Sequence, residues 1–100
     1  PDLGEVTGVV TFDGEPLADA SIAFTQDGFR PSVGHTNSEG QYELIYIRDV
    51  KGAAVGTHVV RIKQFGRQGR IPARFDSDSE LTGEVKPGEN VINFDLRSEP

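Results

Sequence analysis

Short runs of alternating apolar and polar residues, separated by turns that contain glycine, dominate this sequence. Residues 5–13 show the pattern, since Val6, Val10 and Phe12 occupy alternate positions before the chain reaches an Asp13-Gly14 turn. A period of two places one set of side chains on each face of a strand, whereas no helical period lasts for the roughly ten residues that a helix needs. The sequence therefore predicts an all-β domain of strands and tight turns.

The alternation predicts about seven strands, the number typical of an immunoglobulin-like or related two-sheet sandwich. Gly40 ends a short hairpin connection and Gly88 follows Pro87 in an expected type II turn, so both are predicted to have positive φ. Residues 48–56 predict a crossover loop between the sheets of a Greek key, and residues 66–79 predict a long loop. The predicted strands cover residues 5–13, 18–25, 34–37, 41–47, 57–65, 80–86 and 90–97.

One face of each predicted strand is expected to contribute to a single hydrophobic core. The chain has 100 residues, which suffice for one such core but not for two. A single domain covering residues 1–100 is therefore predicted. The side chains expected inside are those of Val6, Val10, Phe12, Ile22, Phe24, Tyr42, Leu44, Val60, Ile62, Leu81, Val85, Ile92, Phe94 and Leu96.

The formal net charge of −6 disfavours binding to nucleic acid or to an anionic membrane, because both need a positive field. The acidic average hides a basic segment, since five cations and no acid occur from Arg61 to Arg74. No apolar run approaches the length of a membrane span, and the absence of cysteine removes disulfides and thiolate chemistry. Neither a nucleic-acid partner nor membrane insertion by this segment is expected.

Two stretches of the chain carry turn motifs in a recognisable order. Residues 6–20 read VTGVVTFDGEPLADA, and residues 34–42 read GHTNSEGQY, which follows the pattern G-x-T-[DN]-x-x-G-x-[YF]. With later stretches at 56–62, 71–75, 81–82 and 85–90, they resemble carboxypeptidase regulatory-like domains, in particular small secreted or lipid-anchored bacterial members. The resemblance covers nearly the whole chain. It implies a seven-stranded antiparallel Greek-key sandwich of the prealbumin (transthyretin-like) class.

The resemblance also implies a kind of function. Domains of this family are mostly accessory, because they space or stabilise a neighbouring domain or mediate contacts at a cell surface. A non-catalytic accessory or interaction domain is therefore expected, secreted, periplasmic or on the outer cell surface, with a protein or a cell-surface glycan as its partner. The chain opens at Pro1 without an initiating methionine, which suggests a processed segment upstream of Pro1, such as a signal peptide or a lipid anchor.

A transthyretin-related hydrolase is the enzymatic alternative. Hydroxyisourate hydrolase shares the implied fold and ends in a Tyr-Arg-Gly-Ser motif that works with histidines and an arginine, whereas this chain ends in DLRSEP. The two histidines, His35 and His58, have no recognisable nucleophile or acid beside them. Both are expected to be strand-end residues that are partly exposed or hydrogen-bonded locally. Neither enzymatic activity nor a cofactor nor a zinc site is predicted.

A carbohydrate-binding module is a second alternative, and it would use the basic segment of residues 61–75. In this segment Arg67, Arg70 and Arg74 lie between Phe65 and Phe75. Arginine binds carboxylate or sulfate through two parallel hydrogen bonds, and aromatic rings can stack on sugar faces. An anionic glycan or an acidic protein surface would suit this chemistry. The competing interpretation is that these arginines pair with acids of the domain itself.

Acidic side chains alternate at Asp76, Asp78 and Glu80, directly after the basic loop. Alternating oxygen ligands are a feature of calcium loops, but the EF-hand pattern requires a glutamate at its twelfth position, where this chain has Pro87. That motif is excluded. An irregular calcium site stays as an alternative to a solvated acidic loop.

Overall fold

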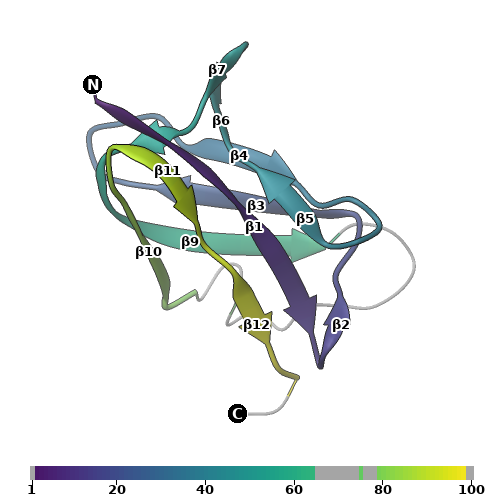
Figure 1. Cartoon of the computed structure of the whole chain (residues 1–100). Helices are drawn as coiled ribbons and strands as arrows, with labels where there is room; N and C mark the ends of the chain where they lie inside the picture. The colour runs from purple at the N-terminus through teal and green to yellow at the C-terminus, as the bar shows by residue number, and fades with distance from the viewer. Residues whose placement is uncertain (1, 65–74, 76–78, 99–100) are drawn as a thin grey trace.

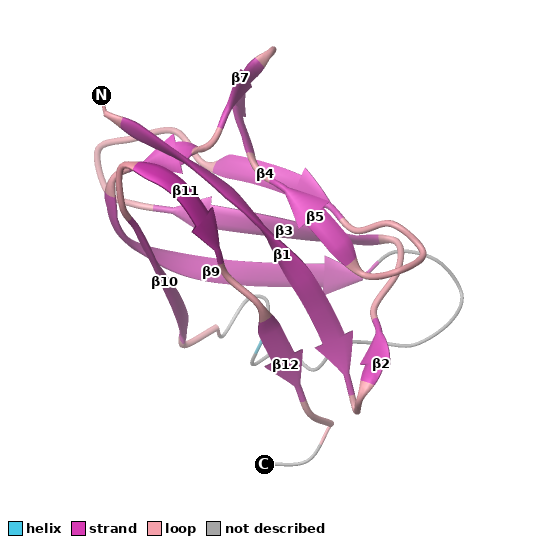
Figure 2. Ribbon diagram, viewed as in Figure 1, coloured by secondary structure: helices cyan, strands magenta, loops and turns pink. Residues whose placement is uncertain are grey.

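The computed structural model describes residues 2–64, 75 and 79–98, which form strands joined by turns and loops (Figure 1). Figure 2 shows the strands. The predicted all-β fold class is confirmed. No helix among the described residues is long and apolar enough to cross a membrane. The strands are β1 (Leu3–Phe12), β2 (Glu15–Pro16), β3 (Ala20–Thr25), β4 (Ser32–His35), β5 (Gln41–Glu43), β6 (Ile45–Ile47), β7 (Val50–Lys51), β8 (Ala53–Ala54), β9 (Gly56–Gln64), β10 (Leu81–Val85), β11 (Gly88–Val91) and β12 (Phe94–Leu96).

Two sheets lie face to face as a sandwich (Figure 1). The second sheet has the strand order β10-β9-β3-β4-β6-β7, and all of its pairings are antiparallel. The first sheet is built around β1, which pairs with β11 and β12 along one edge and with β8, β5 and β2 along the other. The long N-terminal strand predicted from alternation is therefore the central strand of its sheet.

The C-terminal part of the chain runs parallel to β1 in one register, with Gly4 opposite Gly88 and Val10 opposite Phe94. This pairing differs from the antiparallel arrangement expected throughout the sandwich. It arises because the turn at Gly88, where φ is +93°, carries the chain from β10 in the second sheet to the edge of β1 in the first. The positive φ predicted for Gly88 is confirmed.

The predicted strand at 90–97 is divided in two at Ile92 and Asn93. The N–H of Ile92 still donates to the carbonyl of Thr7 at 2.8 Å. The next contact uses a side chain, since the N–H of Val9 donates to Oδ1 of Asn93 at 2.9 Å. Asn93 therefore replaces one backbone acceptor with its side chain, and the register with β1 continues beyond it.

The turn at residues 38–40 carries the chain from one sheet to the other. Gly40 has φ +78°, as predicted, and a Cβ there would lie 2.5 Å from the carbonyl oxygen of Val10. The side chain of Asn37 holds the turn, because its Oδ1 accepts the N–H groups of Glu39 and Gln41 at 2.9 and 3.0 Å. The predicted hairpin is wrong as a pair of strands, since β4 belongs to the second sheet and β5 pairs with β1.

Residues 48–56 contain two short strands where a crossover loop was predicted. β7 pairs with β6 in the second sheet, and β8 pairs with β1 in the first. The chain passes between the sheets at Gly52, where φ is +109°. β8 could not be predicted from alternation, because Ala53 and Ala54 are adjacent apolar residues and both are buried.

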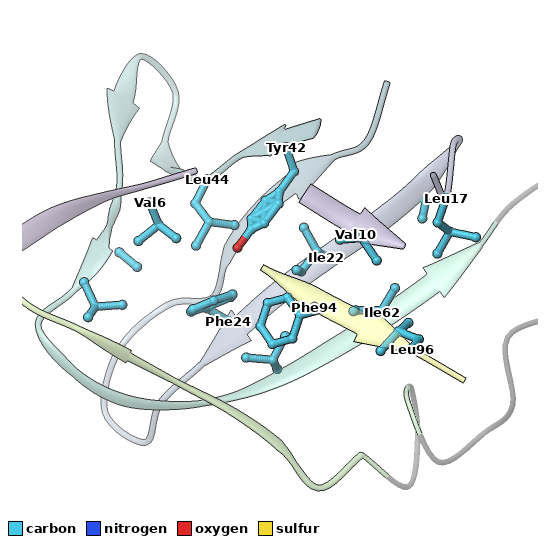
Figure 3. Close-up of a cluster of buried hydrophobic side chains, with 14 residues drawn as sticks. Val6, Val10, Leu17, Ile22, Phe24, Tyr42, Leu44, Ile62, Phe94 and Leu96 are labelled. Carbon is cyan, nitrogen blue, oxygen red and sulfur yellow. The ribbon is translucent and has the colours of Figure 1, made fainter. Parts of the chain in front are cut away.

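Side chains from both sheets meet in one hydrophobic core (Figure 3). Every side chain predicted to lie inside belongs to this core or packs against it, with Phe12, Leu81 and Ile92 only partly buried. Burial of a large apolar side chain contributes roughly 1.5–3 kcal/mol before the loss of chain entropy is subtracted. The structure adds Leu17, Ala20, Ala53 and the partly buried Phe75 to the predicted set.

Tyr42 connects β5 to the C-terminal segment across β1. Its ring is buried in the core (Figure 3), and its hydroxyl donates to the carbonyl of Ile92 at 2.6 Å. Gly8 of β1 makes room for this contact, because a Cβ at Gly8 would lie 1.9 Å from the Ile92 carbonyl oxygen. Burial raises the pKa of Tyr42, since the phenolate would lose its hydration.

Replacement of Tyr42 by phenylalanine is expected to lower the free energy of unfolding by about 1–3 kcal/mol, because the Ile92 carbonyl loses its donor. Urea denaturation measures the change. Tyr46→Phe is the matched control, since Tyr46 on β6 is only partly buried and its hydroxyl makes no hydrogen bond to the described residues. It should change stability by less than about 0.5 kcal/mol. Equal losses in the two variants would contradict a specific role for the Tyr42 hydroxyl.

The raised pKa of Tyr42 also predicts a loss of stability in alkali. The unfolded chain releases the phenolic proton near the ordinary pKa of about 10, whereas the folded chain retains it, so stability falls as pH rises above that value. The stability difference between the wild type and Tyr42→Phe should therefore shrink between about pH 9 and about pH 11. Denaturation at a series of pH values tests this, and a constant difference would count against it.

Candidate binding site

Most residues of the predicted basic loop, namely Phe65, Arg67, Arg70 and Arg74, lie outside the described residues, as do Asp76 and Asp78 of the acidic run. Phe75 is described, and it packs against the core. Glu80 is exposed immediately before β10. Within the described residues, no three His, Cys, Asp or Glu side chains gather as a metal ion would need.

His58 lies inside the sandwich, where its side chain is 1% exposed. Its Nε2 lies 2.6 Å from the carbonyl oxygen of Ala54, and because a carbonyl only accepts, Nε2 carries the proton. The imidazole centroid is 5.6 Å from that of Phe24, and Nδ1 has no partner among the described residues. Of the two predicted alternatives, partial exposure or a local hydrogen bond, His58 shows the hydrogen bond, because this position of β9 faces the core.

The two histidines lie on opposite faces of the second sheet. His35 is exposed at the end of β4, opposite Ser21 on β3, which in turn lies opposite Lys63 on β9. His58 precedes Lys63 by five residues on the same strand and faces the core. Five residues of strand span roughly 16 Å. One reaction centre therefore cannot contain both imidazoles.

The outer face of the second sheet carries the accessible polar side chains that surround an open pocket. Alternation along β9 buries His58, Val60 and Ile62, so its other side chains point outward. Val59 lies at the centre, 41% exposed, between Thr25 of β3 and Thr82 of β10. The pocket has a volume of about 490 Å³. We call it the β9 pocket, and among the described residues it is lined by Thr25, Gln26, Asp27, Thr57, His58, Val59, Arg61 and Thr82. His58 is the one buried residue of this set, and its side chain faces the core.

Charges of opposite sign lie at the two ends of the β9 pocket. Arg61 lies opposite Ala23, whereas Asp27 follows β3 beyond Thr25, toward the other end of the pocket. Arg61 and Asp27 form no ion pair with the described residues. Elsewhere in the described part of the chain, Lys51 pairs with Glu43 and Arg97 pairs with Asp95. Both charges of the pocket are therefore available to a ligand.

The side chain of Gln26 is held in place at the wall of the β9 pocket. Its Nε2 donates to the carbonyl of Thr57 at 3.1 Å, while its Oε1 is buried and accepts no hydrogen bond from the described residues. Gly56 makes this position available, because a Cβ at Gly56 would lie 2.3 Å from Nε2 of Gln26. Because Oε1 is closed to solvent, a ligand does not reach it in this arrangement, and the Gln26 amide serves to shape the wall of the pocket.

Sequence reasoning found Arg61, as the first cation of the basic segment, but missed Gln26, Asp27 and Thr82. These residues lie in a loop and an edge strand that carry no recognisable motif. The pocket depends on the register that sets Thr25 and Thr82 on either side of Val59. Only a pairing prediction between distant strands could have found it.

Comparisons with known proteins establish the fold and no more. No family model matches the chain, and no curated protein matches it. Among solved structures, the chain is similar to a DUF3823 family protein from Parabacteroides merdae, with a TM-score of 0.56 and 19% sequence identity over 95% of this chain. The chain covers 46% of that protein, and so spans about half of its length.

Replacement of His58 by alanine should destabilise the fold by about 2–4 kcal/mol, because it leaves a cavity beside Phe24 and removes the donor to the Ala54 carbonyl. Thermal or urea unfolding measures the loss. His35→Ala is the matched control, since His35 is exposed on β4, and it should shift stability by less than about 0.5 kcal/mol. A larger loss for His35→Ala than for His58→Ala would contradict the assignment.

Proposed function

We propose that this chain is a non-catalytic accessory domain of the cell surface or the periplasm that acts by binding. The observation that carries the proposal is the β9 pocket, where Arg61 and Asp27 have no ion pair with the described residues. Charges that a domain does not use internally are free to contact a partner. The pairing of β3 with β9 sets the backbone positions from which these two side chains extend, one at each end of the pocket.

The positions of the histidines support a role without turnover. General acid–base chemistry needs an imidazole within hydrogen-bond reach of the reacting group and a third group that orients it. His58 is enclosed in the core with Nε2 bound to Ala54, and His35 lies on the opposite face of the sheet. A hydrolase that relied on both would have to rearrange the sandwich.

The resemblance to carboxypeptidase regulatory-like domains supports the accessory role and the location outside the cytoplasm. The structural neighbour supports the accessory role alone, because the part of it that this chain matches is about half of a longer chain. An accessory domain is commonly one unit among several. Another protein or a cell-surface glycan is accordingly the proposed partner.

The carbohydrate-binding alternative gains support from one residue. Arg61 begins the basic segment of residues 61–75, is exposed and lines the β9 pocket. Arginine binds carboxylate or sulfate in two-point geometry. The contributions of Arg67, Arg70 and Arg74 stay a prediction, since these residues lie outside the described part of the chain.

Turnover assays test the proposed function. Hydroxyisourate and model esters, amides and phosphate esters would be incubated with the wild type and with His35→Ala, each confirmed to be folded by circular dichroism. We expect no rate above that of buffer for any substrate. A rate that the wild type shows and His35→Ala loses would overturn the non-catalytic assignment.

A further inference from the structure

We propose that the β9 pocket binds an acidic oligosaccharide, with a sugar carboxylate on Arg61 and sugar hydroxyls along the pocket toward Asp27. The inference rests on the proposed binding function, which it narrows to one ligand class and one site. It differs from recognition by the loop at residues 65–75, because the described residues that line the β9 pocket lie on β3, β9, β10 or the turn after β3.

The dimensions of the β9 pocket suit a small extended ligand. Its volume of about 490 Å³ falls within the range of roughly 300–1,000 Å³ that small-molecule sites occupy. Arg61 and Thr57 mark its two ends on β9, and four residues of strand span roughly 13 Å. A length of this order is better matched by two or more linked sugar rings than by a single small anion.

The pocket presents an apolar group between polar groups, and a sugar ring likewise has an apolar C–H face bordered by hydroxyl groups. Val59 presents exposed methyl groups at the centre, which can contact the C–H face of a sugar ring. Hydroxyl groups of Thr25 and Thr82 lie on either side, in register with Val59. The Thr25 hydroxyl donates to the carbonyl of Val59 at 3.2 Å and keeps a lone pair with which to accept from a ligand.

The distribution of donors and acceptors indicates an acid at one end and hydroxyls at the other. Arg61 offers a planar set of donors that matches a carboxylate. The exposed carboxylate of Asp27 is an acceptor toward the other end of the pocket. Sugar hydroxyls can donate to this carboxylate. A simple inorganic anion would satisfy Arg61 but would leave Asp27 without a donor.

The test is isothermal titration calorimetry with trigalacturonate, and the comparison ligand is its methyl ester, which keeps the sugar skeleton without the charge. Wild type should bind trigalacturonate at least about ten-fold more tightly than the ester, and Arg61→Gln should lose about as much, because each removes a charged hydrogen-bonded pair. Arg61→Lys should bind more weakly than wild type, since it keeps the charge but loses the two-point geometry.

Lys63→Gln is the matched control, because Lys63 is the next outward-facing cation on β9 and does not line the pocket. It should leave the affinity within about two-fold of wild type, as expected for an exposed charge outside the site. Unchanged unfolding midpoints would show that each variant is folded.

Two results would overturn the proposal. Equal weakening by Arg61→Gln and Lys63→Gln would indicate a general attraction between a basic face and an acidic polymer, with no defined pocket. If the wild type does not bind trigalacturonate, an acidic oligosaccharide is excluded as the ligand of the β9 pocket. Either result leaves the non-catalytic assignment intact, because that assignment fails only if the chain shows turnover.

Discussion

The placement of β1 between two sets of strands is the constraint on which the sandwich depends. β1 has hydrogen-bonded partners along both edges, so segments from the middle and the end of the chain must both reach it. Gly8 allows Ile92 to approach closely, and the Tyr42 hydroxyl then reaches the Ile92 carbonyl across β1. Asn93 supplies the acceptor for Val9 where the backbone does not. Three contacts between distant segments therefore hold the first sheet together around β1. Because β1 is paired along both edges, it has no free edge for a strand of another chain to join.

The second sheet is organised differently, and its outer face is where the chain can bind. Alternation along β3 and β9 fills the core from one face and leaves the other face to polar side chains around Val59. Gly56 and Gln26 fix the end of this surface, because the glycine leaves room for the Gln26 amide against Thr57. Binding groups that are already positioned lose little conformational entropy when a ligand arrives.

Features that a local pattern determines can be predicted from the sequence, whereas features that depend on contacts between distant segments cannot. Alternation predicts β1, β3, β9 and nearly all of the core, since the period of two is a property of each strand. The turn at Gly40 was predicted correctly, but its flanking strands join different sheets, which no turn motif encodes. The break at Asn93 and the pocket at Val59 depend on register between strands far apart in the chain. Arg61 could be found from charge alone, whereas the partnerless Oε1 of Gln26 could not.

Mapping of backbone amide chemical shifts in ¹⁵N-labelled protein, during titration with trigalacturonate, tests most directly whether binding occurs on the second sheet. A site in the β9 pocket predicts that shifts concentrate at Thr25, Gln26, Thr57 and Arg61, with the amides of β1 and β12 unchanged. Chemical-shift changes confined to the first sheet, or no change at any residue of the β9 pocket, would contradict a binding site on the second sheet.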